Sequence, residues 1–561
     1  MYDALNAVWN EQIAPGQMFE VITVDVRGVP TRTFAHAPNS LREFWLSAAG
    51  FGEREYLIYE DERLSYEQAQ STAASVANWL HQQGVVPGDR VAIAMRNYPE
   101  WMLAYWAITS MGAVVVGMNA WWVPQEIEYA LEDSGPKVLI CDRERLDRFD
   151  EVRDKFPNLI KVGIRLGEER EGTTSWSEVI ASEATLPEVT IDPDSDACIF
   201  YTSGTTGKPK GAQLTHRGCI ANIMNLAFIN TVQPAAIARS RGEEPPVQDP
   251  NKHLCALLAT PLFHVTANNC AAHLITMVGG KLVHTYKWDA AEALRIIEKE
   301  QVTNFSAVPM MSRELLLHPD FATRDTSSLQ SMGGGGAAVQ PDLVAKMEEE
   351  TENARPSAGY GMTETCGIIA AASGDFLLDK PASVGRAMPT LEAKCVDNDG
   401  NTVPQGERGE LWVRGAPVIK GYLNRPDSMV DGWLETGDIA YIDDTGFIFL
   451  VDRKKEMVLR GGENVYCAEV ESTLFSHDEV AECVIIPVPD DRLGEEVGAA
   501  IFLKEGSSVT AADIRAYCKN QLAAYKIPRY IWFVDQPLPR NANGKFVKRE
   551  VLDALDIADA S

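Results

Sequence analysis

The chain has 561 residues, more than one ordinary hydrophobic core accommodates, so two or more domains are expected. Its hydrophobic fraction of 45% and charged fraction of 23% exclude a largely disordered chain and a fibrous repeat. With 51 Lys and Arg against 80 Asp and Glu, the net charge of −29 argues against nucleic acid as the main partner.

The N-terminal segment has neither a basic region nor an apolar run, so we expect no secretory signal. Residues 101–125 contain no charged side chain and have the length of a membrane helix. However, Gly112 and Gly117 bracket the β-branched run 114–116. This punctuation predicts a buried helix followed by a buried strand, and we expect no integral membrane segment.

Short apolar runs alternate with helical patterns in this part of the chain. Strands are predicted at 90–95 and 138–141, and helices at 99–111 and 124–133. Such alternation indicates an α/β fold with parallel strands joined by crossover helices. Further along, residues 239–252 combine the pair Pro245-Pro246 with mixed charges and are predicted to form a surface loop.

A separate pattern begins after Val451. The C-terminal part is predicted to form a compact α+β unit of about 100 residues, with helices at 469–476 and 511–521 and strands at 479–488, 498–503 and 529–534. The ten cysteines are scattered without a CxxC pair, which favours reduced thiols in a cytoplasmic protein over a zinc or disulfide framework.

The strongest local signal is the segment 201–211, Tyr-Thr-Ser-Gly-Thr-Thr-Gly-Lys-Pro-Lys-Gly, which follows a strand-like run at 197–200. Its three glycines and four hydroxyl side chains can turn N–H and O–H groups onto phosphate oxygens. The loop is not of the Walker type, because Pro209 follows Lys208 where Ser or Thr would be required. It predicts a phosphate-binding site of another kind.

This loop resembles the phosphate loop of the adenylate-forming superfamily, which comprises acyl-CoA synthetases, beetle luciferases and the adenylation domains of peptide synthetases. Five further segments resemble that family's motifs in the family's order: 359–365, 432–438, 452–455, 461–464 and 539–545. The resemblance implies a large N-terminal adenylation domain of several subdomains (1–451), a hinge (452–455) and a small mobile α+β domain (456–561). It implies an AMP-forming acid–CoA ligase that uses ATP, Mg²⁺ and CoA.

The implied reaction brings a carboxylate to the α-phosphate of ATP, so the site must supply positive charge and a cation. By resemblance, Lys545 is the mobile catalytic lysine, Glu364 with Thr202 holds Mg²⁺, and His264 flanks the acyl carboxylate. The implied ATP-binding residues are Thr202, Ser203, Gly204, Thr205, Thr206, Gly207, Lys208, Gly336, Ala337, Ala338, Tyr360, Gly361, Met362, Thr363, Asp438, Leu450 and Arg453. Within this set, Asp438 is expected to accept the ribose hydroxyls and Tyr360 to face adenine.

The second half of the reaction needs a thiol. By resemblance, Lys455 is the hinge pivot, and Gly461, Gly462 and Glu463 line the tunnel for the pantetheine arm of CoA. Leu459 stands where the luciferase branch has a lysine, which weakens a luciferase interpretation. A nucleotide-binding relative without activity would normally lack Lys545 or Glu364, and both are present.

The acid is less constrained by the sequence. The acyl pocket carried over by position consists of His264, Val265, Thr266, Met310, Met311, Gly334, Gly335 and Ile368. These residues are mostly small and apolar, and the glycine run 333–336 suggests a roomy slot, so a medium- or long-chain fatty acid is our first expectation. An aromatic or alicyclic acid, such as a sterol side-chain acid, is the alternative. The expected partners are small molecules, and monomer and homodimer both stay open.

Overall fold

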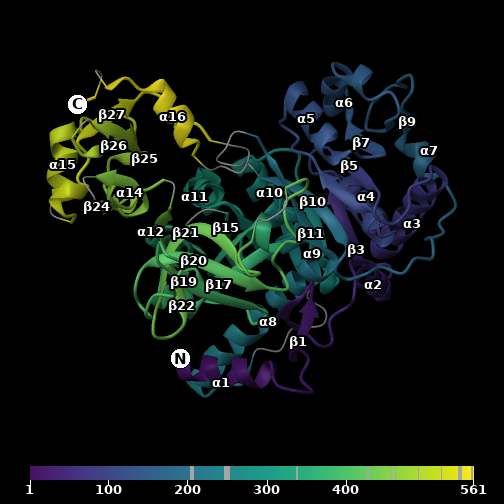
Figure 1. Cartoon of the computed structure of the whole chain (residues 1–561), viewed down its shortest axis with the longest axis horizontal. Helices are drawn as coiled ribbons and strands as arrows, with labels where there is room; N and C mark the ends of the chain where they lie inside the picture. Colours follow the sequence, from purple (N-terminus) through teal and green to yellow (C-terminus); the bar gives the residue numbers. More distant parts are fainter. Residues whose placement is uncertain are drawn as a thin grey trace.

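The structure is a computed structural model. It describes residues 1–202, 208–245, 253–336, 339–425, 429–454, 456–460, 463–490, 492–519, 521–540, 546–557 and 560–561, without the side chains of residues 464 and 549. The described residues form four β-sheets, and helices cover them (Figure 1).

The sheet formed mainly by the first third of the chain has seven strands in a largely parallel arrangement. In spatial order they are β11 (Lys210–Thr215), β10 (Asp196–Thr202), β6 (Val114–Gly117), β5 (Arg90–Ala94), β7 (Val138–Asp142), β8 (Ile160–Ile164) and β9 (Thr174–Ser175). Its helices are α3 (Tyr66–Gln82), α4 (Pro99–Ser110), α5 (Pro124–Ser134), α6 (Arg143–Asp150) and α7 (Trp176–Ile180). Every residue of α4 is buried, which explains its apolar sequence without a membrane.

The largest sheet has thirteen strands. In spatial order they are β19 (Leu391–Val396), β20 (Gly409–Gly415), β21 (Leu434–Ile442), β22 (Phe447–Arg453), β18 (Gly385–Ala387), β17 (Gly367–Ser373), β16 (Arg355–Met362), β15 (Ser331–Gly335), β14 (Asn304–Ala307), β12 (Cys255–Leu258), β13 (Lys281–His284), β3 (Glu55–Tyr59) and β4 (Glu62–Ser65). Strands β13, β12, β14, β15 and β16 run parallel, so their carboxyl ends meet at one edge. Ligands bind preferentially at such an edge in α/β sheets.

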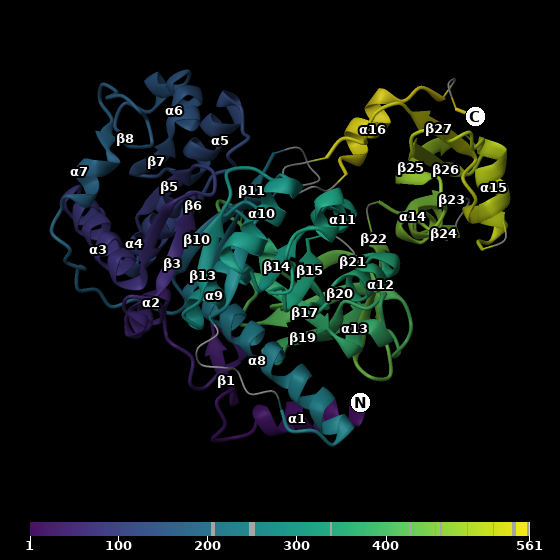
Figure 2. The same cartoon turned by 180° about the vertical axis from the view of Figure 1, so that it is seen from behind.

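Helices cover both faces of the parallel part of this sheet. On one face α10 (Ala290–Glu300), α11 (Pro309–Leu317) and α12 (Pro341–Glu350) enclose an apolar core. On the other face lie α8 (His216–Arg241), the π-helix η3 (Thr266–Ala272) and α9 (His273–Met277). The remaining elements of this region are α1 (Tyr2–Gln12), β1 (Val21–Val26), β2 (Val29–Phe34), α2 (Leu41–Ser47), η1 (Ala48–Phe51), η4 (Pro319–Ala322), η5 (Thr363–Thr365) and α13 (Asp375–Asp379). Figures 1 and 2 show α1 lying alongside α8.

Helix α8 has 26 residues. The Thr215 hydroxyl accepts from the Gly218 N–H at its start, and Gly242 ends it with a φ of 71°. The predicted loop at 239–252 begins three residues too early, because residues 239–241 form the last turn of the helix, and its residues 246–252 lie outside the described residues. Among the described residues, α8 is the one helix long and apolar enough to cross a membrane, but 72% of its most apolar window is buried within the protein, as in a core helix.

The C-terminal part has its own sheet, with strands β24 (Glu463–Val465), β23 (Val458–Arg460), β26 (Gly494–Leu503) and β25 (Val480–Asp490) and with β27 (Tyr530–Val534) paired to β26. Helices α14 (Cys467–Phe475), α15 (Ala511–Lys519) and α16 (Lys548–Ala554) pack around it. This unit stands apart at the upper left of Figure 1. The predicted α/β class with an additional small α+β part is confirmed.

Candidate active site

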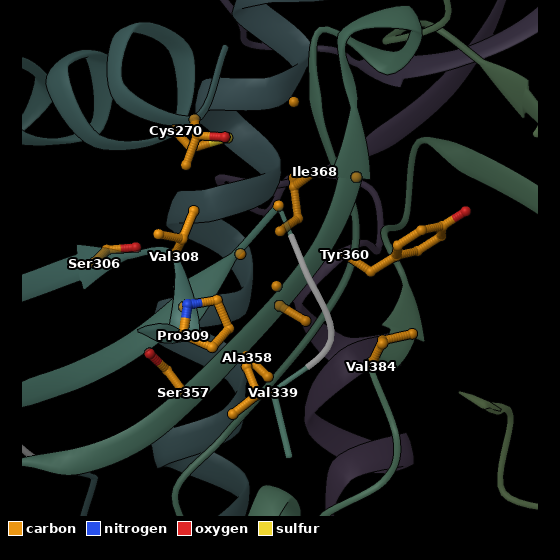
Figure 3. A pocket seen from close by; sticks show the side chains of 18 of the residues that line it. Cys270, Ser306, Val308, Pro309, Val339, Ser357, Ala358, Tyr360, Ile368 and Val384 are labelled. Atoms are coloured by element: carbon orange, nitrogen blue, oxygen red, sulfur yellow. The ribbon is translucent and has the colours of Figure 1, made fainter. Parts of the chain in front are cut away.

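A cleft of about 3560 Å³ opens where the parallel strands β14, β15 and β16 end (Figure 3). Gly335 pairs with Gly359 at the last level of β15 and β16, and Gly336 follows with a φ of +81°. The lining of the cleft also includes residues of β21 and β22 and of the C-terminal helices α14 and α16. One cleft therefore joins segments that are far apart in the sequence.

The glycines at 333–335, beside the cleft, are packed closely against neighbouring strands, whereas the sequence predicts a roomy slot there. A Cβ on Gly333 would lie 2.2 Å from the carbonyl oxygen of Ser357, and one on Gly334 would lie 2.9 Å from that of Ala307. At Gly335 the nearest atom would be the Gly359 oxygen at 3.2 Å, and only at Gly336 does every neighbour lie beyond 3.8 Å. The expectation of a roomy slot is thus wrong for 333–335, where glycine permits close strand packing.

Asp438 is a buried carboxylate at the centre of a polar group in the cleft. It lies in β21 directly opposite Arg453 of β22, and its side chain is 8% exposed. Tyr360 Oη donates to Asp438 Oδ2 over 2.6 Å, and Arg453 Nε lies 3.0 Å from Oδ1. Burial, together with this carboxylate, raises the pKa of Tyr360 well above its ordinary value, so the phenol is a constant donor.

Glu364 lies in η5 and is 7% exposed. Tyr422 Oη donates to its Oε1 over 2.6 Å, while the Glu364 carbonyl accepts from the Ile419 N–H over 3.0 Å. Burial, followed by the Glu364 carboxylate, raises the pKa of Tyr422 above its ordinary value. Lys210 lies with Nζ 5.2 Å from the centre of the Tyr422 ring, and Thr202 Oγ1 approaches the Lys210 carbonyl at 3.5 Å.

The donor set of this region fits Mg²⁺ better than a soft metal. The described residues contain no cluster of three or more His, Cys, Asp and Glu that could hold a metal ion by itself. A single buried carboxylate with one oxygen engaged by a phenol suits an ion that takes its remaining ligands from phosphates and water. Glu364, with Thr202 nearby in the same cleft, is the group that fits.

His264, the first residue of the predicted acyl pocket, lines the cleft after β12 and is half-buried. Its ring packs against Phe263 at a centroid distance of 4.6 Å. The chain then forms the π-helix η3, a rare element that often marks functional sites. Buried Asn222 and Asn269 fix it, because Asn222 Nδ2 donates to the Asn269 carbonyl over 3.0 Å and its Oδ1 accepts from the Ile368 N–H over 2.8 Å.

Most predicted site residues with described side chains line this one cleft. They are Thr202, His264, Val265, Thr266, Met310, Gly334, Gly335, Gly336, Tyr360, Gly361, Met362, Thr363, Glu364, Ile368, Asp438, Leu450 and Arg453. Met311 does not line it, because its side chain packs into the core beneath α11. Lys208 is exposed, with Nζ 4.9 Å from the centre of the Tyr129 ring, and Glu463 is exposed in β24.

Several predicted residues lie outside the described residues. They are Ser203, Gly204, Thr205, Thr206, Gly207, Ala337, Ala338, Lys455, Gly461, Gly462 and Lys545. The sequence reasoning also missed residues that line the cleft: Tyr422, Cys270, Ser306 and Ser357. No sequence motif surrounds Tyr422. By contrast, polar residues alternate with apolar ones around Ser306 and Ser357, and this alternation in the sequence predicts a polar face on each strand.

Comparisons with known proteins show the family of the chain. Residues 44–423 match the family described as AMP-binding enzyme, and residues 469–545 match the AMP-binding enzyme C-terminal domain. A feruloyl-CoA synthase from an Amycolatopsis species is 32% identical over 87% of this chain and 93% of its own length. A long-chain-fatty-acid–CoA ligase of Bacillus subtilis is 31% identical over 90% and 93% of the two chains.

Two further proteins extend the comparison. A 3-(7a-methyl-1,5-dioxo-octahydro-1H-inden-4-yl)propanoyl:CoA ligase of Rhodococcus jostii is 32% identical, over 92% of this chain and 98% of its own. Among solved structures, the o-succinylbenzoate coenzyme A synthetase of Bacillus subtilis in complex with ATP and magnesium superposes with a TM-score of 0.74 at 30% identity, over 91% and 99% of the chains.

Proposed function

We propose that the substrate of this chain is a carboxylic acid with an elongated, largely apolar body. The chain belongs to the AMP-binding enzyme family and is an AMP-forming acid–CoA ligase that uses ATP, Mg²⁺ and CoA. A medium- or long-chain fatty acid is the first candidate. The observation that carries this proposal is the continuity of one cleft, which runs from the buried Asp438 and Glu364 to apolar residues of α8 and α9.

In the first step we propose that a carboxylate oxygen of the acid forms a bond to the α-phosphorus of ATP, while the bond to the bridging oxygen breaks and pyrophosphate leaves. Asp438 accepts the ribose hydroxyls, with Arg453 beside it at 3.0 Å. Lys545 supplies positive charge to the approaching anions. Bound Mg²⁺ would neutralise phosphate charge, and Glu364, oriented by the Tyr422 hydroxyl, is the residue that would hold it with Thr202.

In the second step the sulfur of CoA attacks the acyl carbon, the bond to AMP breaks, and the thiol proton passes to solvent. We propose that residues 456–561 form a mobile domain and that 452–455 are its hinge, with Lys455 as pivot. Side chains of this segment contact both sides: Arg453 pairs with Asp438 and Lys454 with Glu410 over 2.9 Å, whereas the Asp452 carboxylate accepts from the Cys467 N–H. Gly461, Gly462 and Glu463 would line the pantetheine path.

An aromatic or alicyclic acid is the second candidate. The feruloyl-CoA synthase and the indenyl-propanoyl:CoA ligase, whose names indicate ring acids, are as similar to this chain as the fatty-acid ligase. The volume of the cleft accommodates either class. We also propose a cytoplasmic location, consistent with ten free thiols of which nine are buried.

The test is a panel of acids assayed with the full chain, ATP and Mg²⁺, in the presence and absence of CoA, with pyrophosphate release and acyl-CoA formation both measured. For a fatty-acid ligase, kcat/KM should rise about fourfold for each added methylene, from roughly 0.8 kcal/mol per buried CH₂, until the cleft is filled. A flat response across acetate, octanoate and palmitate would contradict the fatty-acid candidate. Selectivity for ferulate or a steroid acid would support the second.

A further inference from the structure

The cleft continues beyond the proposed acyl site along one face of the β14–β16 sheet. Phe305, Ala307 and Met332 of these strands pack into the core under α10–α12. Because side chains alternate along a strand, Asn304, Ser306 and Ser331 project from the opposite face, toward α8. All three line the cleft.

The strand register arranges these side chains in rows across the sheet. Ser306 is level with Gly333 and Ser357, whereas Asn304 is level with Ser331 and Arg355. The first row lies two residues back from the level of Gly335 and Gly359, and the second lies four residues back. At about 3.3 Å per residue, these rows lie about 7 Å and about 13 Å from the carboxyl edge. Figure 3 shows Ser306 and Ser357 beside the cleft.

The opposite wall is mostly apolar. It is formed by Leu226, Asn230, Pro234 and Ile237 of α8 and by Leu274 and Val278 at α9. Helix α8 runs past the sheet, because Gln233 contacts the C-terminal end of β17, where its Oε1 accepts from the Ser373 N–H over 2.9 Å. One turn later, Ile237 lies near the row that contains Arg355. A Cβ on Gly374 would lie 3.8 Å from Ile237 Cδ1 and 3.7 Å from Arg355 Nε.

The polar wall has hydrogen-bonding capacity that the protein itself does not use. Among the described residues, the Ser306 hydroxyl and the Asn304 side-chain N–H groups have no hydrogen-bond partner, although Thr303 donates to Asn304 Oδ1 over 2.6 Å. Ser331 and Ser357 share one weak hydrogen bond of 3.3 Å between their hydroxyls. A fully apolar body against this wall would leave these groups desolvated and unpaired, which is unfavourable for binding.

We propose that the acid activated here is oxygenated: its body is apolar toward α8 and carries hydroxyl or carbonyl oxygens along the strand-facing edge, about 7 Å and about 13 Å beyond the level of Gly335. This inference rests on the proposed function, because it requires the carboxyl group at the carboxyl edge of the sheet. It narrows both candidate classes to members with oxygen substituents at those distances, and it disfavours saturated, unsubstituted chains.

The experiment compares matched acids. Cholic acid is paired with 5β-cholanic acid, which has the same ring skeleton without hydroxyls, and 12-hydroxystearic acid is paired with stearic acid. Pyrophosphate release and acyl-CoA formation are measured with the full chain, ATP, Mg²⁺ and CoA. We expect kcat/KM for at least one hydroxylated acid to exceed that of its unsubstituted partner by tenfold or more, because a site built to bind hydroxyls rejects analogues that lack them.

The same ratio is then measured in Ser306→Ala and in the double variant Ser306→Ala/Ser357→Ala, with Ser177→Ala as control. Ser177 is an exposed serine of α7 outside the cleft. We expect the preference for the hydroxylated acid to fall at least fivefold in the double variant and to persist in the control. Ser306→Ala removes no hydrogen bond among the described residues, so it keeps the test valid if the double variant does not fold.

Two results would overturn the inference while leaving the proposed function intact. One is efficient turnover of unsubstituted acids with no gain from hydroxyls, and the other is a hydroxyl preference that folded Ser306 and Ser357 variants retain in full. Absence of pyrophosphate release with every acid would overturn the proposed function as well.

Discussion

Tyr422 is the residue whose removal most directly tests the proposed cation site. Its hydroxyl donates to Glu364 Oε1 over 2.6 Å, inside the cleft. Tyr422→Phe keeps the ring, and with it the packing near Lys210 Nζ at 5.2 Å, but removes this one donor. We expect the variant to fold normally and to lose activity, because the Glu364 carboxylate is then free to rotate away from the orientation that would hold Mg²⁺.

The size of the loss follows from the hydrogen bond. A bond to a charged group contributes about 1.5–3 kcal/mol, which corresponds to roughly tenfold to a hundredfold in rate or affinity. We expect the Mg²⁺ concentration for half-maximal activity to rise and kcat for adenylation to fall within that range, while the KM for the acid changes little. The assay is acid-dependent pyrophosphate release without CoA, measured across a Mg²⁺ titration.

The matched control is Tyr2→Phe. Tyr2 Oη also donates to a carboxylate, that of Asp379 over 2.5 Å, but this pair is exposed and lies outside the cleft. Its removal should leave the Mg²⁺ titration unchanged. If Tyr422→Phe retains its melting temperature and also shows the wild-type Mg²⁺ dependence and rate, Glu364 does not need the phenol, and the assignment of this pair to the cation site is refuted.

The other predictions concern the two half-reactions, the ribose and pH. Lys545→Ala should lose acyl-adenylate formation by orders of magnitude but still convert supplied acyl-adenylate and CoA to thioester; loss of both in folded protein would contradict its role. Asp438→Asn should raise the KM for ATP tenfold or more and erase discrimination against 2′-deoxy-ATP, measured by pyrophosphate release; retained discrimination would place the ribose elsewhere. Burial lowers the pKa of His216 to about 4 and those of His273 and His284 to about 3. Their neutral forms therefore stabilise the fold above about pH 6.5, and this contribution is lost as pH falls, by about 2 kcal/mol for each histidine at pH 5. The free energy of unfolding, measured in urea, should depend less on pH in His284→Leu than in the wild type. An equal pH dependence in the two proteins would argue against a buried neutral His284.

Local sequence patterns predicted the fold well where the residues of an element alone determine its secondary structure. Val114–Gly117 is a strand because a β-branched run bounded by glycines has few alternatives, and its four residues are buried. The predicted loop at 239–252 begins too early because its mixed charges include Arg239 and Arg241, although basic residues are favourable in the last turn of a helix. What decides there is Gly242, whose left-handed conformation ends the helix.

The site was predicted where residues form contiguous motifs and missed where it depends on contacts between distant segments. Asp438 and Arg453 were named from separate motifs, and the pairing of β21 with β22 places them opposite each other. Tyr422 and Glu364 are 58 positions apart, and no local pattern around Tyr422 indicates the contact. Met311 was assigned to the pocket by position alone, but neighbouring residues of a helix point in different directions, and it faces the core.

The polar rows of β14–β16 show how sequence and register combine. A parallel sheet covered by helices on both faces is expected to be apolar on both, and the face toward α10–α12 follows this rule with Phe305 and Met332. Ser306 and Ser357 depart from it, and each departure alone would be unremarkable in a strand. The register places both on one face at one level, with Gly333 between them. In the part of the chain that the structure describes, helix α8 makes no hydrogen bond to Ser306 or Ser357, and both residues line the cleft. We therefore expect a bound ligand, rather than the protein, to provide the hydrogen-bond partners of this face.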